Sequence, residues 1–288
     1  MKNAHQKYWQ ILPVGPTSYG DSPYQSFSTY AGNPYFISLE ELIEEGLLTE
    51  EECDKVDFGN RIDKVNYEKL YNGRFKLLKK AYKKSNISEK EDFDKFKSEN
   101  CYWLNDYAMF MAIKDRFNGQ SFDKWAEDIK LRWGYSMEYY QNELKDEIEF
   151  YKFIQYEFYR QWYKLKKYAN ENGIKIIGDI PIYVAYDSAD VWAHPELFQM
   201  DENGKPVAVA GCPPDGFSAT GQLWGNPLYR WDYHKQTNYD WWIKRIERSV
   251  KLYDVVRIDH FRGFDEYYSI PAEDEDATNG HWGKGAWD

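Results

Sequence analysis

The sequence predicts an α/β fold, namely an incomplete (β/α)8 barrel (TIM barrel) interrupted by a helical insertion at about residues 39–150. Two short β-branched runs each follow a helical stretch, which is the pattern of βαβ units and a parallel sheet. Both runs end in a carboxylate, and catalytic residues of (β/α)8 barrels lie at the C-terminal ends of strands. Roughly 110 residues ahead of these runs have helical periodicity and form the predicted insertion.

The first predicted strand is the run Tyr8–Val14, a short apolar segment closed by proline and glycine. The following segment, residues 15–32, is dense in Gly, Pro, Ser and Tyr. That composition is typical of an irregular loop at a strand end.

The helical part begins at Ser38, where Ser38 and Glu41 have the spacing of a capping box. In such a box the serine oxygen accepts a free backbone N–H and the glutamate reaches back to the serine N–H. Helical periodicity continues over residues 67–78 and 101–117, and in a long stretch from Ser136 to about Ala169.

The two later strands are predicted at Gly173–Pro181, which contains Asp179, and at Tyr253–His260, which contains Asp259. The helix ahead of the last strand is predicted at Trp241–Leu252. Without the insertion fewer than about 180 residues remain, whereas a (β/α)8 barrel typically uses about 250. We therefore expect residues 1–288 to form a partial catalytic barrel domain that does not close on its own.

Composition excludes several classes of protein. The net charge of −11 argues against nucleic acid as a partner, since phosphates need a basic face. No run of about eighteen apolar residues predicts a membrane span, and the polar start of the chain does not look like a secretory signal. The three cysteines are far apart and no Cys-x-x-Cys pair exists, which favours a reducing cytoplasmic location. No phosphate-binding loop and no metal-ligand cluster is present, so we expect neither a metal nor an organic cofactor.

The aromatic content is high, with 26 Tyr, 16 Phe and 12 Trp making 19% of the chain. Aromatic rings offer flat apolar faces, and Tyr and Trp add a polar edge, which matches the faces and hydroxyl rims of sugar rings. The alternative is that most of these rings pack in the core. The excess therefore suggests a glycan site without establishing one.

Arg257 and Asp259 are the first candidate catalytic pair. Residues i and i+2 of a strand point to the same face, so both side chains point together. A neighbouring guanidinium favours an ionised carboxylate, which a retaining glycosidase needs as its nucleophile. The alternative is a structural ion pair at a strand end.

Asp179 stands at the corresponding end of the preceding strand and is predicted either to bind substrate hydroxyls or to cap the following loop. Two such strand-end carboxylates favour a common site. His260, next to Asp259, is a candidate substrate contact, with a packing role as the alternative. His194 is a candidate too, and its alternative is an ordinary loop histidine.

The segment 210–231 is the third candidate element, a long stretch rich in Gly, Trp, Asn and Gln. Long loops in compact domains are usually lids or binding loops. We therefore expect a lid, the alternative being that its glycines serve only as turns.

Five segments together resemble the 4-α-glucanotransferases, the amylomaltase or disproportionating-enzyme family of the α-amylase clan. They are Tyr8–Phe27 (YWQILPVGPTSYGDSPYQSF), Gly178–Val184 (GDIPIYV), Asp187–Pro195, residues 209–231, and Arg257–Phe264 (RIDHFRGF). These segments are long, stand in family order and span nearly the whole chain.

The resemblance implies a (β/α)8 barrel that cleaves an α-1,4-glucan and passes the new end to the 4-hydroxyl of another glucan. Its expected partners are maltooligosaccharides and starch- or glycogen-type glucans. Asp259 resembles the nucleophile and Arg257 the residue that keeps it charged. The other matched positions are substrate-binding: Tyr24 and Asp179 in the sugar pocket, Asp215, Gln222 and Trp224 in the covering loop, and Tyr19 in a secondary glucan site.

The sequence departs from the family pattern in two places. The barrel strand that precedes the first motif has no counterpart here, and neither have the acid/base glutamate and the third catalytic aspartate. We therefore expect a fragment that is inactive alone. Two other functions stay open: an α-1,4-glucan hydrolase of the same clan, and a non-catalytic glycan-binding fragment.

Overall fold

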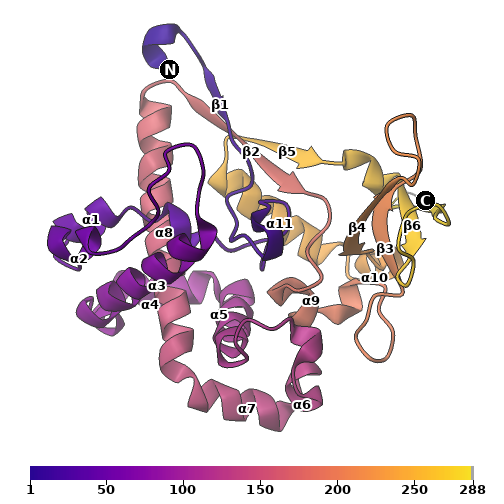
Figure 1. The fold of residues 1–288 in the computed structure, drawn as a ribbon, viewed down its shortest axis with the longest axis horizontal. Coiled ribbons are helices and arrows are strands. Elements are labelled where there is room, and N and C mark those ends of the chain that lie inside the picture. The colour runs from indigo at the N-terminus through magenta and orange to yellow at the C-terminus, as the bar shows by residue number, and fades with distance from the viewer. Residues whose placement is uncertain (287–288) are drawn as a thin grey trace.

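The structure, a computed structural model, describes residues 1–286 and contains two sheets (Figure 1). The first has three parallel strands in the order β1-β2-β5: β1 (Tyr8–Gln10), β2 (Lys175–Pro181) and β5 (Val255–Asp259). These are the three strands that the sequence predicts, and they confirm an α/β fold with parallel pairing.

Between β1 and β2 the chain is mostly helical from Leu39 onward, as predicted. In Figure 1 these helices lie together on one side of the molecule. They are α1 (Leu39–Glu44), α2 (Glu50–Asp54), α3 (Tyr67–Lys84), α4 (Glu91–Glu99), α5 (Cys101–Arg116), α6 (Glu127–Lys130), α7 (Gly134–Glu143) and α8 (Lys145–Glu171). The predicted long helix from Ser136 is divided at Leu144, whose φ of −105° and ψ of 25° depart from helical values.

The start of α1 differs from the predicted capping box. The Ser38 hydroxyl accepts the Glu41 N–H at 3.1 Å, as expected. The reciprocal bond is absent, because the Ser38 N–H donates to Gln161 of α8 at 2.7 Å and Glu41 pairs with Lys164. A tertiary partner has thus replaced the local one.

Helix α8 fixes the loop that follows β1. Gln155 accepts the Gly32 N–H at 2.7 Å and donates to the Gly32 carbonyl at 2.9 Å. A Cβ on Gly32 would lie 1.9 Å from the Phe158 ring, so only glycine fits there. This contact holds residues 15–32, including Tyr24, close to the ends of the parallel strands.

The second sheet is antiparallel in the order β4-β3-β6-β7, and Figure 1 shows it at the end of the molecule away from the helices α1–α4. Its strands are β3 (Ala208–Cys212), β4 (Gln222–Pro227), β6 (Glu266–Pro271) and β7 (His281–Lys284). The segment 210–231, expected as a long loop that forms a lid, therefore contains most of a β-hairpin made by β3 and β4. Glycine and proline hide the strand pattern, and Gly211 is required because a Cβ there would lie 2.1 Å from the Gln222 carbonyl oxygen.

Three further helices complete the fold: α9 (Ala189–Ala193), α10 (Trp231–Gln236) and α11 (Asp240–Leu252), the last confirming the helix predicted there. Short 3-10 helices connect the elements: η1 (Lys2–Ala4), η2 (Tyr19–Asp21), η3 (Pro34–Phe36), η4 (Ile87–Glu89), η5 (Phe122–Lys124), η6 (Pro195–Leu197) and η7 (Phe261–Phe264). Within residues 1–286, none of the helices has the length and apolar character needed to cross a membrane.

Candidate active site

The two strand-end carboxylates meet through one guanidinium. Asp179 of β2 is the register partner of Arg257 of β5, so their side chains lie on the same face of the parallel pair. Arg257 donates to Asp179 Oδ2 at 2.7 Å and to Asp259 Oδ1 at 2.6 Å. The geometry predicted from strand parity is confirmed: all three side chains lie in one cluster.

Tyr24 joins this cluster from the loop after β1. Its hydroxyl donates to Asp179 Oδ2 at 2.7 Å. Burial, together with this hydrogen bond to a carboxylate, raises the pKa of Tyr24 to about 12. Tyr24 is therefore a neutral hydrogen-bond donor at any physiological pH.

The two carboxylates differ in exposure. The Asp179 side chain is 4% exposed and its Oδ1 is buried without a hydrogen-bond partner, whereas the Asp259 side chain is 40% exposed. The hydrogen bonds to both aspartates raise the pKa of Arg257, so the guanidinium is permanently charged. The cluster thus combines an enclosed acceptor oxygen, Asp179 Oδ1, with an open carboxylate, that of Asp259. The Arg257 guanidinium binds both aspartates and so fixes how far apart they lie.

His260 and Trp224 form the wall beside Asp259. His260 has a left-handed backbone (φ 54°) that ends β5 and turns its ring toward the second sheet. The ring centroid lies 4.8 Å from Trp224 in an edge-to-face contact, and the His260 Nε2 is buried without a partner. Burial lowers the pKa of His260, an effect that Asp259 opposes. The sequence offered no direct signal for the Trp224 contact, since β4 was not expected.

The other residues of the hairpin contact the cluster less closely. Gln222 accepts the Trp224 indole N–H at 3.0 Å and so orients that ring. Asp215 is exposed at the tip, where its Oδ1 accepts the backbone N–H groups of Phe217 and Ser218 at 2.8 Å each. Asp215 therefore shapes the hairpin turn, and the structure gives it no bond to Asp259 or Asp179.

Tyr19 and His194 lie away from the cluster. Tyr19 is 61% exposed and lines a separate cavity of about 1000 Å³, where its hydroxyl donates to the Gly119 carbonyl. His194 ends α9 and pairs with Glu196 at 3.3 Å, on the wall of another cavity.

One residue that supports the cluster was missed from the sequence. Arg245 of α11 is 1% exposed and donates to the carbonyls of Pro181 and Ile182, two and three residues after Asp179. Its guanidinium lies against Trp241 and Trp242, with 5.5 Å and 4.8 Å to the ring centroids. The available signal was an arginine on the apolar face of the predicted helix Trp241–Leu252.

The chemistry of the cluster is that of an oxygen nucleophile beside polar groups that bind hydroxyls. Among residues 1–286, no three His, Cys, Asp or Glu side chains are grouped so as to hold a metal ion. The aspartates are instead paired with a guanidinium and a phenol. An open carboxylate so placed is suited to attack on an electrophilic carbon.

Comparison with known proteins gives a consistent result. A family model described as 4-alpha-glucanotransferase matches residues 1–288. The 4-alpha-glucanotransferase of Clostridium butyricum is 52% identical over 286 residues, covering 99% of this chain and 59% of its own length. That of Thermus thermophilus is 47% identical over 288 residues, covering 99% and 57%.

A solved structure is similar over the same region. The amylomaltase from Streptococcus agalactiae in complex with acarbose superposes with a TM-score of 0.94 at 44% identity, covering 99% of this chain and 58% of that chain. The chain thus spans somewhat more than half the length of the relatives it matches.

Proposed function

The chain belongs to the 4-alpha-glucanotransferase family, and from that premise we propose that it carries the nucleophile side of a retaining glucan transfer. The enzyme of this family would move α-1,4-glucan segments to the 4-hydroxyl of an acceptor glucan or of glucose. The observation that carries the proposal is the cluster in which Arg257 bridges the open Asp259 and the buried Asp179. Maltooligosaccharides and starch- or glycogen-type glucans are the proposed substrates.

The proposed reaction has two displacements at one carbon. Asp259 attacks the anomeric carbon, the glycosidic C–O bond breaks, and the leaving oxygen takes a proton from an acid. The 4-hydroxyl of the acceptor then attacks the same carbon, loses its proton to the conjugate base, and releases the Asp259 carboxylate. Arg257 holds Asp259 Oδ1, which leaves the second carboxylate oxygen for attack.

Asp179 is proposed to bind the sugar at the point of cleavage. Its Oδ2 is held by Tyr24 and Arg257, and its Oδ1 has no partner within the described chain. A buried acceptor without a donor is costly unless a ligand supplies one. A sugar hydroxyl is such a donor.

The hairpin β3–β4 is proposed to cover the bound glucan. Trp224 would contact sugar and help exclude water, with His260 beneath it and Gln222 holding its indole. Asp215, at the tip of the hairpin, is proposed to close over the bound glucan. Tyr19, in its own cavity, is proposed to contribute to a secondary glucan site.

Within residues 1–286, the carboxyl groups of the cluster are Asp259 and Asp179, and neither is placed as a proton donor for the leaving oxygen. Retaining chemistry needs a second carboxyl group about 5–5.5 Å from the nucleophile. Asp179 already accepts hydrogen bonds from Tyr24 and Arg257, which is the arrangement of an acceptor and not of a proton donor. We propose that the 288 residues alone do not turn over natural glucans.

The exposed parts of the parallel sheet support an incomplete (β/α)8 barrel. β1 and β5 are both edge strands, with Tyr8 53% and Val255 42% exposed. Edges with exposed apolar side chains are normally covered. We propose that further strands cover them in the active enzyme, with the helices at about 39–150 as an insertion in that barrel. The free thiols Cys53, Cys101 and Cys212 fit a cytoplasmic location.

Incubation with maltotriose tests this function. A protein of the relatives' full length that contains this chain should make maltooligosaccharides longer than maltotriose. Glucose and maltose alone would show hydrolysis, the second candidate, which the 40% exposure of Asp259 favours by admitting water. The 288-residue chain should bind maltotriose without converting it. Steady formation of longer products by this chain would refute the proposal that it lacks a proton donor for the leaving oxygen.

A further inference from the structure

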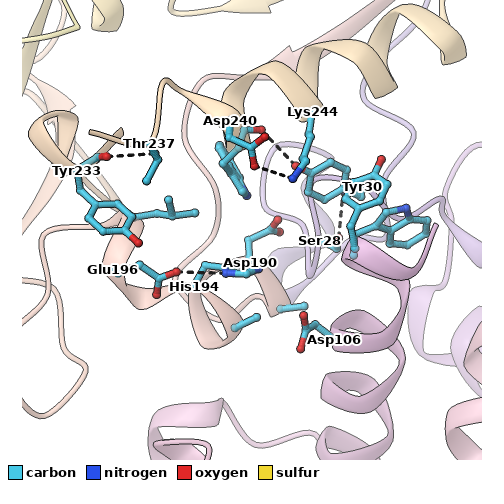
Figure 2. A pocket seen from close by; sticks show the side chains of 16 residues that line it. Ser28, Tyr30, Asp106, Asp190, His194, Glu196, Tyr233, Thr237, Asp240 and Lys244 are labelled. Atoms are coloured by element: carbon cyan, nitrogen blue, oxygen red, sulfur yellow. Dashed lines mark hydrogen bonds and ion pairs between the residues drawn. The ribbon is translucent and has the colours of Figure 1, made fainter. Parts of the chain in front are cut away.

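The cavity lined by His194, of about 190 Å³, lies between the loop at Ser28 and the helices α5, α9, α10 and α11 (Figure 2). Neither Arg257, Asp179 nor Asp259 lines it. Its lining combines aromatic rings with carboxylates and two basic side chains. The proposed function makes no use of it.

Asp190 is the most enclosed carboxylate of this cavity. The residue is 6% exposed, and Figure 2 shows its carboxylate among the other lining side chains, between Asp240 and His194. Its Oδ2 accepts the Thr29 backbone N–H at 2.8 Å, and within residues 1–286 no basic side chain forms an ion pair with it. Burial raises the pKa of Asp190 to about 6. A carboxylate so enclosed is stabilised by any ligand that donates hydrogen bonds to it.

The rim of the cavity carries paired donors and acceptors. Lys244 and Asp240 form an ion pair at 2.6 Å, and His194 pairs with Glu196 at 3.3 Å (Figure 2). A cationic ligand would meet like charge at Lys244, and an anionic ligand would meet the carboxylates. A neutral ligand with several hydroxyl groups can use both kinds of partner.

The walls are aromatic. Trp103 stacks on Tyr30, with ring centroids 6.1 Å apart and planes 19° from parallel. Trp241 meets Tyr30 edge to face at 6.4 Å. Flat apolar walls beside carboxylates suit a ring with C–H faces and a hydroxyl rim.

We propose that this cavity binds a single neutral hexopyranose, such as glucose, at a site separate from the Asp259 cluster. The volume admits one ring and not a glucan chain. Sugar hydroxyls would donate to Asp190 and accept from Lys244, while a ring face packs on the Trp103–Tyr30–Trp241 wall. Because the proposal concerns binding alone, it stands or falls independently of glucan transfer by this chain.

The test is a titration of the 288-residue chain with D-glucose, followed by saturation-transfer NMR and calorimetry. Lys244→Met and Asp240→Asn change side chains that are 44% and 61% exposed, so folding is not at risk. We expect each to weaken glucose binding about tenfold, the effect of losing one hydrogen bond to a charged group. Lys55→Met is the matched control, because Lys55 and Glu51 form an i,i+4 pair of the same 2.6 Å length away from the cavity.

Two comparisons separate this site from its rivals. Glucose binding that falls in Lys244→Met and not in Lys55→Met is binding at this cavity and not at the Asp259 cluster, and tetramethylammonium should not compete with glucose. The proposal is overturned if glucose does not bind at millimolar concentrations, or if Lys244→Met binds it as well as Lys55→Met does. Competition by the cation would also overturn it.

Discussion

Tyr24→Phe removes one defined interaction from the Asp259 cluster. The lost bond is the 2.7 Å contact from the Tyr24 hydroxyl to Asp179 Oδ2, in a carboxylate side chain that is 4% exposed. A hydrogen bond to a charged group contributes about 1.5–3 kcal/mol to stability. Tyr24 is only partly buried, so water can replace some of the bond. We therefore expect the free energy of unfolding to fall by about 1.5 kcal/mol.

The assay is urea unfolding of the 288-residue chain at pH 7, followed by tryptophan fluorescence. Tyr82→Phe is the matched control, because the Tyr82 hydroxyl donates to the Asp146 carboxylate at 3.0 Å in an exposed contact. The control should lose about 0.5 kcal/mol at most. If Tyr24→Phe is no less stable than Tyr82→Phe, the Tyr24 hydroxyl does not hold the buried Asp179 carboxylate.

Three further predictions concern chemistry, the covering hairpin and pH. Asp259→Asn, in a full-length protein containing this chain, should lower glucan transfer at least about 10³-fold while maltotriose binding persists, since an amide is not a carboxylate nucleophile; substantial residual turnover would assign the nucleophile elsewhere. Trp224→Ala in the same protein should raise the ratio of hydrolysis to transfer in a maltotriose product analysis, and an unchanged ratio would count against the covering role. Burial lowers the pKa of His234 from 6.5 to about 4. As pH falls through that range, His234 is therefore protonated in the unfolded chain before it is protonated in the folded chain, which favours unfolding. Wild type should therefore lose about 2 kcal/mol more stability than His234→Gln between pH 7 and pH 5, measured by urea unfolding, and equal losses would show that His234 does not titrate as described.

The parallel sheet and its cluster were predictable because their signals are local. β-branched runs mark β2 and β5, and strand parity alone places Arg257 and Asp259 on one face. The pairing of Asp179 with Arg257 also follows, since strand-end residues of neighbouring parallel strands meet at the same edge.

The second sheet was not predictable on the same basis. β3 and β4 contain glycine and proline where a strand pattern needs β-branched residues, and β3 also pairs with β6, which lies more than fifty residues later in the chain. The capping box predicted at Ser38 forms only in part for a similar reason. The Ser38 N–H donates to Gln161, a tertiary acceptor that no local sequence pattern reveals. Arg245 was missed because a buried arginine on an apolar helix face is unusual unless its partners are known.

The most direct test of the central claim is covalent trapping at Asp259. A 5-fluoro-α-glucosyl fluoride carries a leaving group that departs without a proton donor, so the 288-residue chain should form the glycosyl-enzyme and stop there. Peptide mass spectrometry should find one added glycosyl group on the peptide that contains Asp259, and none in Asp259→Asn. A label on another carboxylate, or no label on a folded chain that binds the reagent, would contradict the assignment of Asp259 as the nucleophile.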